Sequence, residues 1–181
     1  PTGEPSPVAV AEFRGRAMQL VERYFQLENP SAVDVFGTER YVKGELADGV
    51  VVQGYIDRLD RLPDGSLVVA DYKTGKAPNP RFAADKWVQL QIYAILLRAE
   101  GESVAEMRLH FLGGDAPQTL QSPVVADELA GVAHEMAYYA RLIRRSVDQR
   151  EFEAKRSKLC DWCSFQDKCP AYGRTALPLP Y

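Results

Sequence analysis

The sequence predicts an α/β protein in which a mixed central sheet is flanked by helices. Short runs rich in β-branched and aliphatic residues, bounded by turn sequences, predict strands. Three longer stretches whose apolar residues recur at helical spacing predict helices, and the two kinds of segment alternate along the chain. With 181 residues, 46% of them hydrophobic, the chain is long enough to bury a core. We expect a single domain over residues 1–181.

The first half of the chain predicts one helix and three strands. Apolar residues at helical spacing predict a helix over Val8–Leu27, which ends at an Asn-Pro pair and which we expect to serve packing only. A strand follows over Val33–Leu46. Val50–Leu62 and Ser66–Lys73 are rich in β-branched and aliphatic residues, and the Pro-Asp-Gly sequence between them predicts an antiparallel hairpin.

The second half predicts two helices, a second hairpin and a loop. A helix over Ala84–Glu100 follows a polar, proline-containing turn. Met107–Leu112 and Thr119–Val125 predict a hairpin around a Gly-Gly-Asp turn. Asp127–Val147 predicts a long amphipathic helix with an apolar face along its whole length. The segment 158–170 is expected to be a cysteine-containing loop of the same domain.

The charge of the chain limits how it can meet nucleic acid. A net charge of −3 argues against a protein that coats nucleic acid through bulk positive charge. Between Arg141 and Lys158, however, seven basic residues stand against three acidic ones. This stretch is either a solvated helix face with its exit loop or a contact for a DNA backbone. No apolar run is long enough to span a bilayer, so no membrane association is expected.

The first hairpin carries the chemistry of a candidate site. Strand side chains alternate between faces, so Asp71 and Lys73 share one face, and Asp57 on the partner strand can reach that face. Paired carboxylates suit a hard divalent cation such as Mg²⁺. A lysine beside them can orient a water or offset charge on a phosphate. The alternative is a surface Asp–Lys ion pair. Arg58 and Asp60 are expected to pair with neighbouring residues.

A wider pattern resembles the PD-(D/E)XK nucleases of the RecB-like branch. Its parts are Gly-x-Ile-Asp-Arg-Leu-Asp around Asp57, the Asp-Tyr-Lys-Thr-Gly sequence from Asp71, and Gln-x-x-x-Tyr on the next predicted helix. The resemblance implies a restriction-endonuclease-like fold, Asp57 and Asp71 as ligands of Mg²⁺ or Mn²⁺, and Lys73 as the catalytic lysine. It also implies that Gln89 and Tyr93 line the catalytic site.

The same resemblance implies two further metal contacts and a function. The backbone carbonyl of Tyr72 is a further ligand in many relatives. Glu39 is similar to a weaker acidic motif and is either near the metal or an exposed strand glutamate. The implied activity is metal-dependent hydrolysis of DNA, as an exonuclease on single strands or ends, in repair or recombination and with a helicase partner or fused helicase domain. The rival is a catalytically silent DNA-binding or scaffold module of the same fold.

Three cysteines, Cys160, Cys163 and Cys169, lie within ten residues. Their odd number and Cys-x-x-Cys spacing favour metal or cluster binding over disulfides, and therefore a reducing, cytoplasmic location. Zinc and a [4Fe–4S] cluster each take four ligands, so one ligand has to come from elsewhere. A zinc-stabilised adaptor and plain reduced thiols are the alternatives.

The cysteine spacing resembles that of the iron–sulfur type of RecB-like nuclease. Those proteins place one cysteine, and soon after it a metal-binding histidine, before the catalytic motifs, and three cysteines after them. Here the chain begins with Pro1, and neither His110 nor His134 precedes the catalytic strands. We therefore expect a C-terminal part of a longer protein, in which part of the domain and the fourth cysteine precede Pro1.

Overall fold

The computed structural model describes residues 6–79 and 83–173. The chain divides into two compact units, Pro1–Ala137 and Tyr138–Tyr181. The first unit holds the whole sheet and the candidate site. The second holds the rest of the last long helix and three short 3₁₀ helices, at Lys158–Trp162, Gln166–Lys168 and Pro170–Tyr172.

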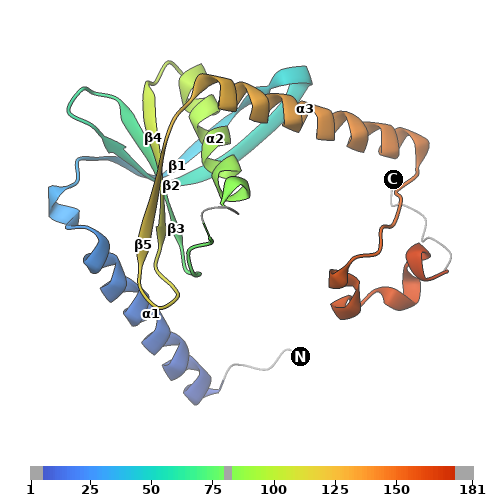
Figure 1. Cartoon of the computed structure of the whole chain (residues 1–181), viewed down its shortest axis with the longest axis horizontal. Coiled ribbons are helices and arrows are strands. Elements are labelled where there is room, and N and C mark those ends of the chain that lie inside the picture. The colour runs from blue at the N-terminus through green and yellow to red at the C-terminus, as the bar shows by residue number, and fades with distance from the viewer. Residues whose placement is uncertain (1–5, 80–82, 174–181) are drawn as a thin grey trace. The chain divides into compact units, whose positions relative to one another are not determined.

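Five strands form one mixed sheet, as predicted, in the order β1-β2-β3-β4-β5 (Figure 1). Neighbouring strands are antiparallel except β3 and β4, which are parallel. Helix α2, Ala84–Ala99, forms the crossover that a parallel pair requires. The strands are β1 Val35–Leu46, β2 Val50–Arg61, β3 Leu67–Lys73, β4 Val104–Phe111 and β5 Gln118–Pro123. Two 3₁₀ turns, Pro30–Ala32 and Ala47–Gly49, precede and follow β1.

The β2–β3 hairpin forms around the predicted Pro-Asp-Gly turn. Gly65 takes a left-handed φ of 85°, which favours glycine, and the Asp64 carboxylate accepts a hydrogen bond from the Ser66 amide at 3.0 Å. The ladder between the strands runs from Arg61↔Leu67 to Arg58↔Ala70. Beyond that pair the strands carry the two aspartates of the candidate site.

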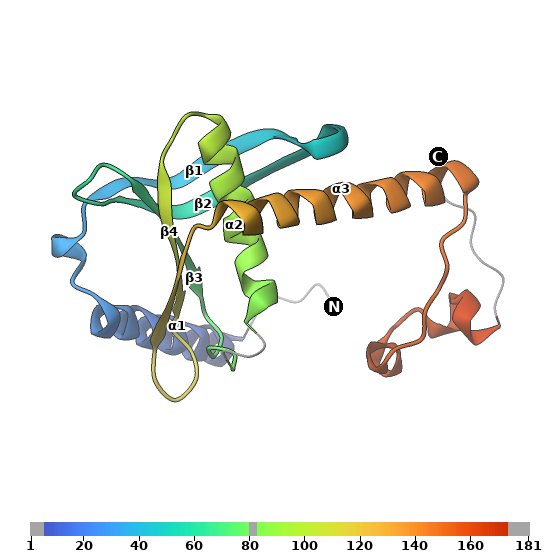
Figure 2. The ribbon, with the colours of Figure 1, turned by 45° about the horizontal axis from the view of Figure 1, so that its top comes forward.

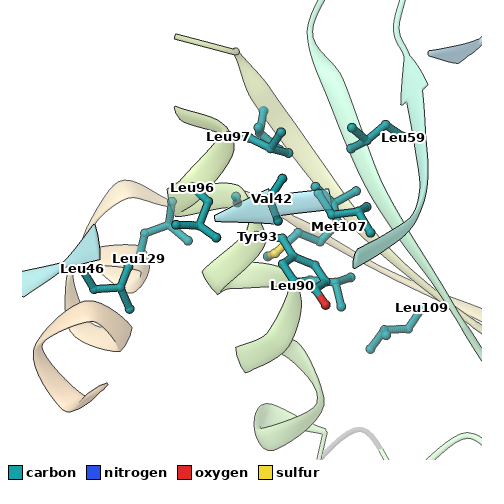
Figure 3. Close-up of a cluster of buried hydrophobic side chains, with 14 of the residues drawn as sticks. Val42, Leu46, Leu59, Leu90, Tyr93, Leu96, Leu97, Met107, Leu109 and Leu129 are labelled. Atoms are coloured by element: carbon teal, nitrogen blue, oxygen red, sulfur yellow. The ribbon is translucent and has the colours of Figure 1, made fainter. Parts of the chain in front are cut away.

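The core lies between the sheet and α2 (Figure 3). Leu90 and Leu97 of α2 are fully buried against strand residues such as Leu59 and Met107. Burial of each such side chain stabilises the fold by about 1.5–3 kcal/mol. This packing holds one face of α2 against the strands that carry the aspartates. Figure 2 shows α2 lying against the sheet near β1 and β2.

Helix α1, Pro7–Leu27, corrects one expectation. Ser6 caps it by accepting a hydrogen bond from the Ala9 amide at 3.2 Å. All of α1 is described, and none of its residues is buried; Phe13 and Val21 of the predicted apolar face are 67% and 51% exposed. The helix is therefore not a packing element only. Its last turn makes a polar contact with the sheet instead, where the Tyr24 hydroxyl accepts a hydrogen bond from Arg58 of β2.

Helix α3, Ala126–Gln149, is buried only in its first part. Leu129 and Val132 are buried, whereas Ile143 and Val147 are 58% and 54% exposed. The apolar face predicted along the whole helix is thus buried only in the part that belongs to the unit with the sheet. Among the described residues, no helix is both long and apolar enough to cross a membrane.

Candidate active site

A continuous chain of contacts connects the end of β3 with α2. The Lys73 Nζ lies 2.7 Å from Asp71 Oδ2 and donates a hydrogen bond to Gln89 Oε1 at 3.2 Å. The Gln89 Nε2 in turn donates to the Tyr93 hydroxyl at 3.0 Å. Gln89 and Tyr93 are four residues apart and so share one face of α2. The structure therefore brings together four of the residues that the sequence singled out.

Asp57 joins this group through the main chain of β3. Its Oδ2 accepts a hydrogen bond from the Tyr72 amide at 2.9 Å. Because the β2–β3 ladder ends at Arg58↔Ala70, this carboxylate satisfies an amide that the partner strand does not reach. The two aspartates lie close enough for the charge of Asp57 to raise the pKa of Asp71.

Asp71 is the buried carboxylate of the site. Burial raises its pKa, the ammonium of Lys73 opposes that rise, and the charge of Asp57 adds to it. Its side chain is 5% exposed, whereas that of Lys73 is 32% exposed. The Lys73 ammonium at 2.7 Å from Oδ2 pairs the charge of this buried carboxylate.

These carboxylates have the donor chemistry of a Mg²⁺ or Mn²⁺ site. The ammonium of Lys73 offsets one of these two neighbouring carboxylates, and a hard cation, which takes oxygen ligands, would offset the other. Residues 6–79 and 83–173 contain no group of three Cys, His, Asp or Glu side chains placed to hold a metal ion. Magnesium does not require one, because it commonly takes one or two carboxylates and completes its shell with water and phosphate oxygens. Asp57 and Asp71 therefore fit such an ion.

Glu39 lies at an irregularity of β1 beside Asp57. Its neighbours Thr38 and Arg40 pair with Arg58 and Ile56, so the register places Glu39 across from Asp57. Glu39 has a φ of 48°, which is uncommon for a residue other than glycine, and its side chain is exposed. The exposed side chain fits the expectation of an exposed strand glutamate, and the expected role near the metal stays a prediction.

Comparison with known proteins identifies the family. The model of the PD-(D/E)XK nuclease superfamily matches residues 2–170. The chain belongs to this superfamily. The Gene 69 protein of Mycobacterium phage D29 is 35% identical over 85 residues, which are 43% of this chain and 29% of that protein. The alignment thus covers less than a third of that relative's length.

Two solved structures resemble this chain. One, from Eubacterium rectale, is provisionally described as an exonuclease; it has a TM-score of 0.55 and 18% identity, covering 92% of this chain and 62% of its own. The other, SSO0001, has a TM-score of 0.49 and 20% identity, covering 92% and 72% of the two chains. At such identities the Eubacterium rectale structure supports the fold alone.

A second polar group of this PD-(D/E)XK domain centres on Arg58, which is 4% exposed. Its Nε lies 2.8 Å from Asp60 Oδ1, and its Nη1 forms an ion pair with Glu28 of the segment that follows α1. Arg58 and Asp60 therefore pair as expected. The partner that the sequence analysis missed is Glu28. Its position just after a predicted helix gave no sign that it would be carried to a buried arginine.

Burial raises the pKa of the Asp60 and Glu28 carboxyl groups, whereas pairing with Arg58 lowers it. Burial raises the pKa of Asp60 more than Arg58 lowers it, because Asp60 is almost fully enclosed. Burial also acts to raise the pKa of Glu28, but the hydrogen bonds from Arg58 and Tyr24 outweigh it, and the net pKa is lowered. His110 of β4 is buried nearby, and that burial lowers its pKa to about 4.

A groove of about 600 Å³ lies between β2 and the first turns of α2. We call it the β2–α2 groove. Val52, Val88 and Ile92 give it a largely apolar lining to which Asp85 adds a carboxylate, and Gln89 connects it with Lys73. The described residues that line it include no lysine or arginine. The volume falls in the range of ligand-binding clefts in proteins.

The three cysteines lie in the second unit with free thiols. The Ser157 amide donates to Cys160 Sγ at 3.2 Å, and the Phe165 amide donates to Cys163 Sγ at 3.4 Å. The printed sequence supplies three cysteines, whereas a [4Fe–4S] cluster takes four protein ligands. Within the described part of the chain, the cysteines do not form a three-ligand metal group. The residues present thus do not complete a cluster site by themselves.

Proposed function

We propose that this chain is the nuclease domain of a protein that hydrolyses phosphodiester bonds in DNA with Mg²⁺ or Mn²⁺. One observation carries the proposal: the Asp57 and Asp71 carboxylates lie beside Lys73, which is linked through Gln89 to Tyr93. Membership of a nuclease superfamily makes phosphodiester hydrolysis the natural use of this arrangement. The RecB-like branch is proposed from the Gln-x-x-x-Tyr pair.

Each residue has a separate proposed task. Asp57 and Asp71 would hold the divalent ion together with the main-chain carbonyl of Tyr72, and a bound ion would supply Lewis-acid polarisation of the phosphate and its water. Lys73 is partly exposed, so its ammonium can orient a water or stabilise negative charge in the transition state. Gln89 would fix the position of Lys73, and Tyr93 would fix that of Gln89.

An unpaired strand is the substrate form that the β2–α2 groove supports. Its apolar lining and lack of described cations suit bases rather than phosphates. Bases of a duplex are stacked and paired, so only a single strand or a frayed end offers them at low cost. Action on single strands or ends, as an exonuclease in repair or recombination, follows as a proposal. A helicase partner or fused helicase domain and a cytoplasmic location are proposed with it.

The main rival is a silent DNA-binding module of the same fold. Silent relatives of a nuclease are expected to lose charged site residues, whereas here all three are present: Asp71 pairs with Lys73, and Asp57 accepts a hydrogen bond from the amide of Tyr72, the residue between them. These observations favour the enzyme.

For the cysteines we propose a [4Fe–4S] cluster completed by a ligand from outside this chain. Three thiols at Cys-x-x-Cys-x5-Cys spacing favour the cluster, and amide hydrogen bonds to two of the sulfurs are the kind of contact that tunes such clusters. Metal and sulfide analysis of full-length protein purified without oxygen tests this. Iron with sulfide supports the cluster, zinc supports an adaptor, and neither metal leaves plain thiols.

Cleavage assays on the full-length protein test the proposed activity. Linear single-stranded DNA, linear duplex and closed circular single-stranded DNA are each incubated with Mg²⁺, with Mn²⁺ and with EDTA. We expect cleavage of the linear single strand with either metal, none with EDTA, and an intact circle. Cleavage of the circle would replace the exonuclease by an endonuclease, and no cleavage of any DNA would favour the silent module.

A further inference from the structure

Tyr72 connects the two polar groups of the domain from opposite sides of β3. Its amide donates to Asp57 on the side of the candidate metal site. Successive strand side chains point to opposite faces, so its ring lies on the face away from Asp71 and Lys73. There its hydroxyl lies 2.6 Å from Arg58 Nη1.

The ring of Tyr72 is held on several sides. It stacks on His110 with ring centres 5.3 Å apart and planes at 26°. Tyr24 of α1 meets it edge-on at 5.6 Å, and Tyr24 also accepts a hydrogen bond from Arg58 at 3.0 Å. With Glu28, these residues form what we call the Arg58 cluster: Tyr24, Glu28, Arg58, Asp60, Tyr72 and His110.

The buried charges of the Arg58 cluster disfavour any arrangement in which Arg58 loses its partners. A buried guanidinium is tolerated only when its donors are paired, and Arg58 bonds Glu28, Asp60 and two tyrosine hydroxyls. Removing one partner would leave buried charge unpaired, which costs far more than an exposed ion pair contributes. The contacts of Arg58 therefore hold the end of α1 against the face of β3 that is opposite to the side chains of Asp71 and Lys73.

The position of the Tyr72 main chain depends on the contacts of the Arg58 cluster. On one side Tyr72 pairs with His110 in the parallel β3–β4 ladder. On the other side the β2–β3 ladder has ended, and the amide is bonded by the Asp57 side chain. The Tyr72 N–H belongs to the peptide unit shared with Asp71, and the Tyr72 carbonyl to the unit shared with Lys73. A tilt of β3 at Tyr72 would therefore shift both the donor to Asp57 and that carbonyl. The ring contacts oppose such a tilt from the opposite face.

We propose that the Arg58 cluster is a positioning device that sets the geometry of the metal site from the reverse face of the sheet, and that it couples the end of α1 to metal binding. The coupling to metal rests on the proposed function. The positioning of the Tyr72 amide by the cluster does not. Glu28, Arg58 and the Tyr72 hydroxyl are thus positioning groups that touch neither the ion nor the substrate.

The test uses two variants of the full-length protein and a matched control. Tyr72→Phe removes the hydroxyl and keeps the ring and main chain, and Glu28→Gln removes one charge and keeps an acceptor. Tyr41→Phe is the control, because its exposed hydroxyl also donates a hydrogen bond, to Gln53 at 3.0 Å, but lies outside the cluster. Mn²⁺ affinity is measured by calorimetry, exchange of the Tyr72 amide by NMR without metal, and kcat and KM on single-stranded DNA.

We expect both cluster variants to bind Mn²⁺ about ten-fold more weakly, since loss of groups that orient metal ligands typically costs 10- to 100-fold. Exchange of the Tyr72 amide should accelerate, and kcat should fall more than KM rises. Tyr41→Phe should match the wild type in Mn²⁺ affinity and in exchange of the Tyr72 amide. If Glu28→Gln fails to fold, Tyr72→Phe still decides the question.

Two outcomes distinguish the positioning role of the Arg58 cluster from the proposed metal site. Folded cluster variants that melt earlier but keep wild-type Mn²⁺ affinity and amide exchange would overturn the positioning role and leave the cluster purely structural. A wild type that binds no Mn²⁺ would overturn the proposed metal site instead. In that case the exchange of the Tyr72 amide, measured without metal, still shows whether the Arg58 cluster positions this peptide.

Discussion

The Tyr93 hydroxyl lies directly against Gly54, so that a Cβ atom added at Gly54 would lie 2.7 Å from it. The absence of a side chain on β2 therefore lets α2 place Tyr93, and through it Gln89 and Lys73, beside the aspartates. Strand glycines commonly mark such close approaches. The glycine that opens the Gly-x-Ile-Asp sequence thus has a physical role in the site.

Gly54→Ala should displace Tyr93 and disturb the contacts of Gln89. Overpacking of this kind typically destabilises a protein by about 1–3 kcal/mol, and we expect cleavage to fall with it. Combining Gly54→Ala with Tyr93→Leu should recover much of the stability, because the clash is removed, but not the cleavage. Urea unfolding and single-strand cleavage measure the two effects. Equal recovery of both would mean that Tyr93 contributes only its bulk.

Lys73→Ala and Asp71→Asn should both abolish cleavage but should differ in metal binding. Asp71→Asn removes a proposed ligand, so Mn²⁺ affinity should fall strongly. Lys73→Ala removes a cation 2.7 Å from Asp71 Oδ2, so affinity should stay the same or rise. Lys76→Ala is the control, because Lys76 pairs with Asp115 on the surface at 3.1 Å. Calorimetry and cleavage rates check this, and activity lowered only a few-fold in either site variant contradicts the assignment.

Gln89→Ala and Tyr93→Phe should weaken cleavage without weakening metal binding. Gln89 holds Lys73 through one hydrogen bond, and Tyr93 holds Gln89 through another. Neither residue is a proposed ligand, so Mn²⁺ affinity measured by calorimetry should stay at the wild-type value while kcat falls. A parallel loss of metal affinity would place these side chains in the metal shell or in the fold itself.

Local patterns in the sequence were enough to predict the hairpin. Strand alternation places Asp71 and Lys73 on one face, and helical spacing does the same for Gln89 and Tyr93, but their selection as site residues came from the resemblance to RecB-like nucleases. The pairing of Arg58 with Glu28 did not follow from any local pattern, because it joins side chains 30 residues apart from different elements. The same limit applies to α1 and the end of α3. Their apolar spacing predicts a helix, but burial depends on what covers it, and Phe13 and Ile143 remain exposed.

A charge placed in the β2–α2 groove should impair binding of a single strand. Val88 lines this groove, and Val88→Glu would put a carboxylate where bases are proposed to bind. Contacts with single bases are worth about 1–3 kcal/mol, so KM for single-stranded DNA should rise roughly ten-fold with little change in kcat. Val125→Glu is the control, since Val125 is 41% exposed and lies outside the groove. An unchanged KM in the Val88 variant contradicts the proposed path of the strand.

The buried His110 should make the stability of the domain depend on pH. Its Nδ1 lies 2.9 Å from the Thr119 hydroxyl, and its Nε2 lies 3.5 Å from Arg58 Nη2. Because Arg58 can only donate, Nε2 acts as the acceptor and the proton belongs on Nδ1. Arg108 also faces the ring and opposes a second proton, whereas Glu28 favours one. Burial outweighs Glu28 and lowers the pKa of His110 to about 4 in the folded state.

The direction of this pH dependence follows from the difference between the pKa of His110 in the unfolded chain and in the folded chain. An unfolded histidine has its ordinary pKa of about 6.5, so between that value and about 4 the unfolded chain binds more protons at His110 than the folded chain. The stabilisation is complete above the unfolded pKa and is lost as the pH falls through this window. The raised pKa values of Asp60 and Asp71 act in the opposite sense, and the lowered pKa of Glu28 acts in the same sense, so a variant without the histidine is needed to isolate the contribution of His110.

Urea unfolding in EDTA should therefore show a loss of at most about 2 kcal/mol between pH 7 and pH 5. His110→Gln cannot titrate and should remove most of this slope, although its stability at pH 7 will be lower because a buried contact is changed. His134→Gln is the matched control, since His134 is exposed on α3, and it should keep the wild-type slope. A slope that survives in His110→Gln would show that other groups produce the pH dependence, and that His110 is not held neutral in the fold.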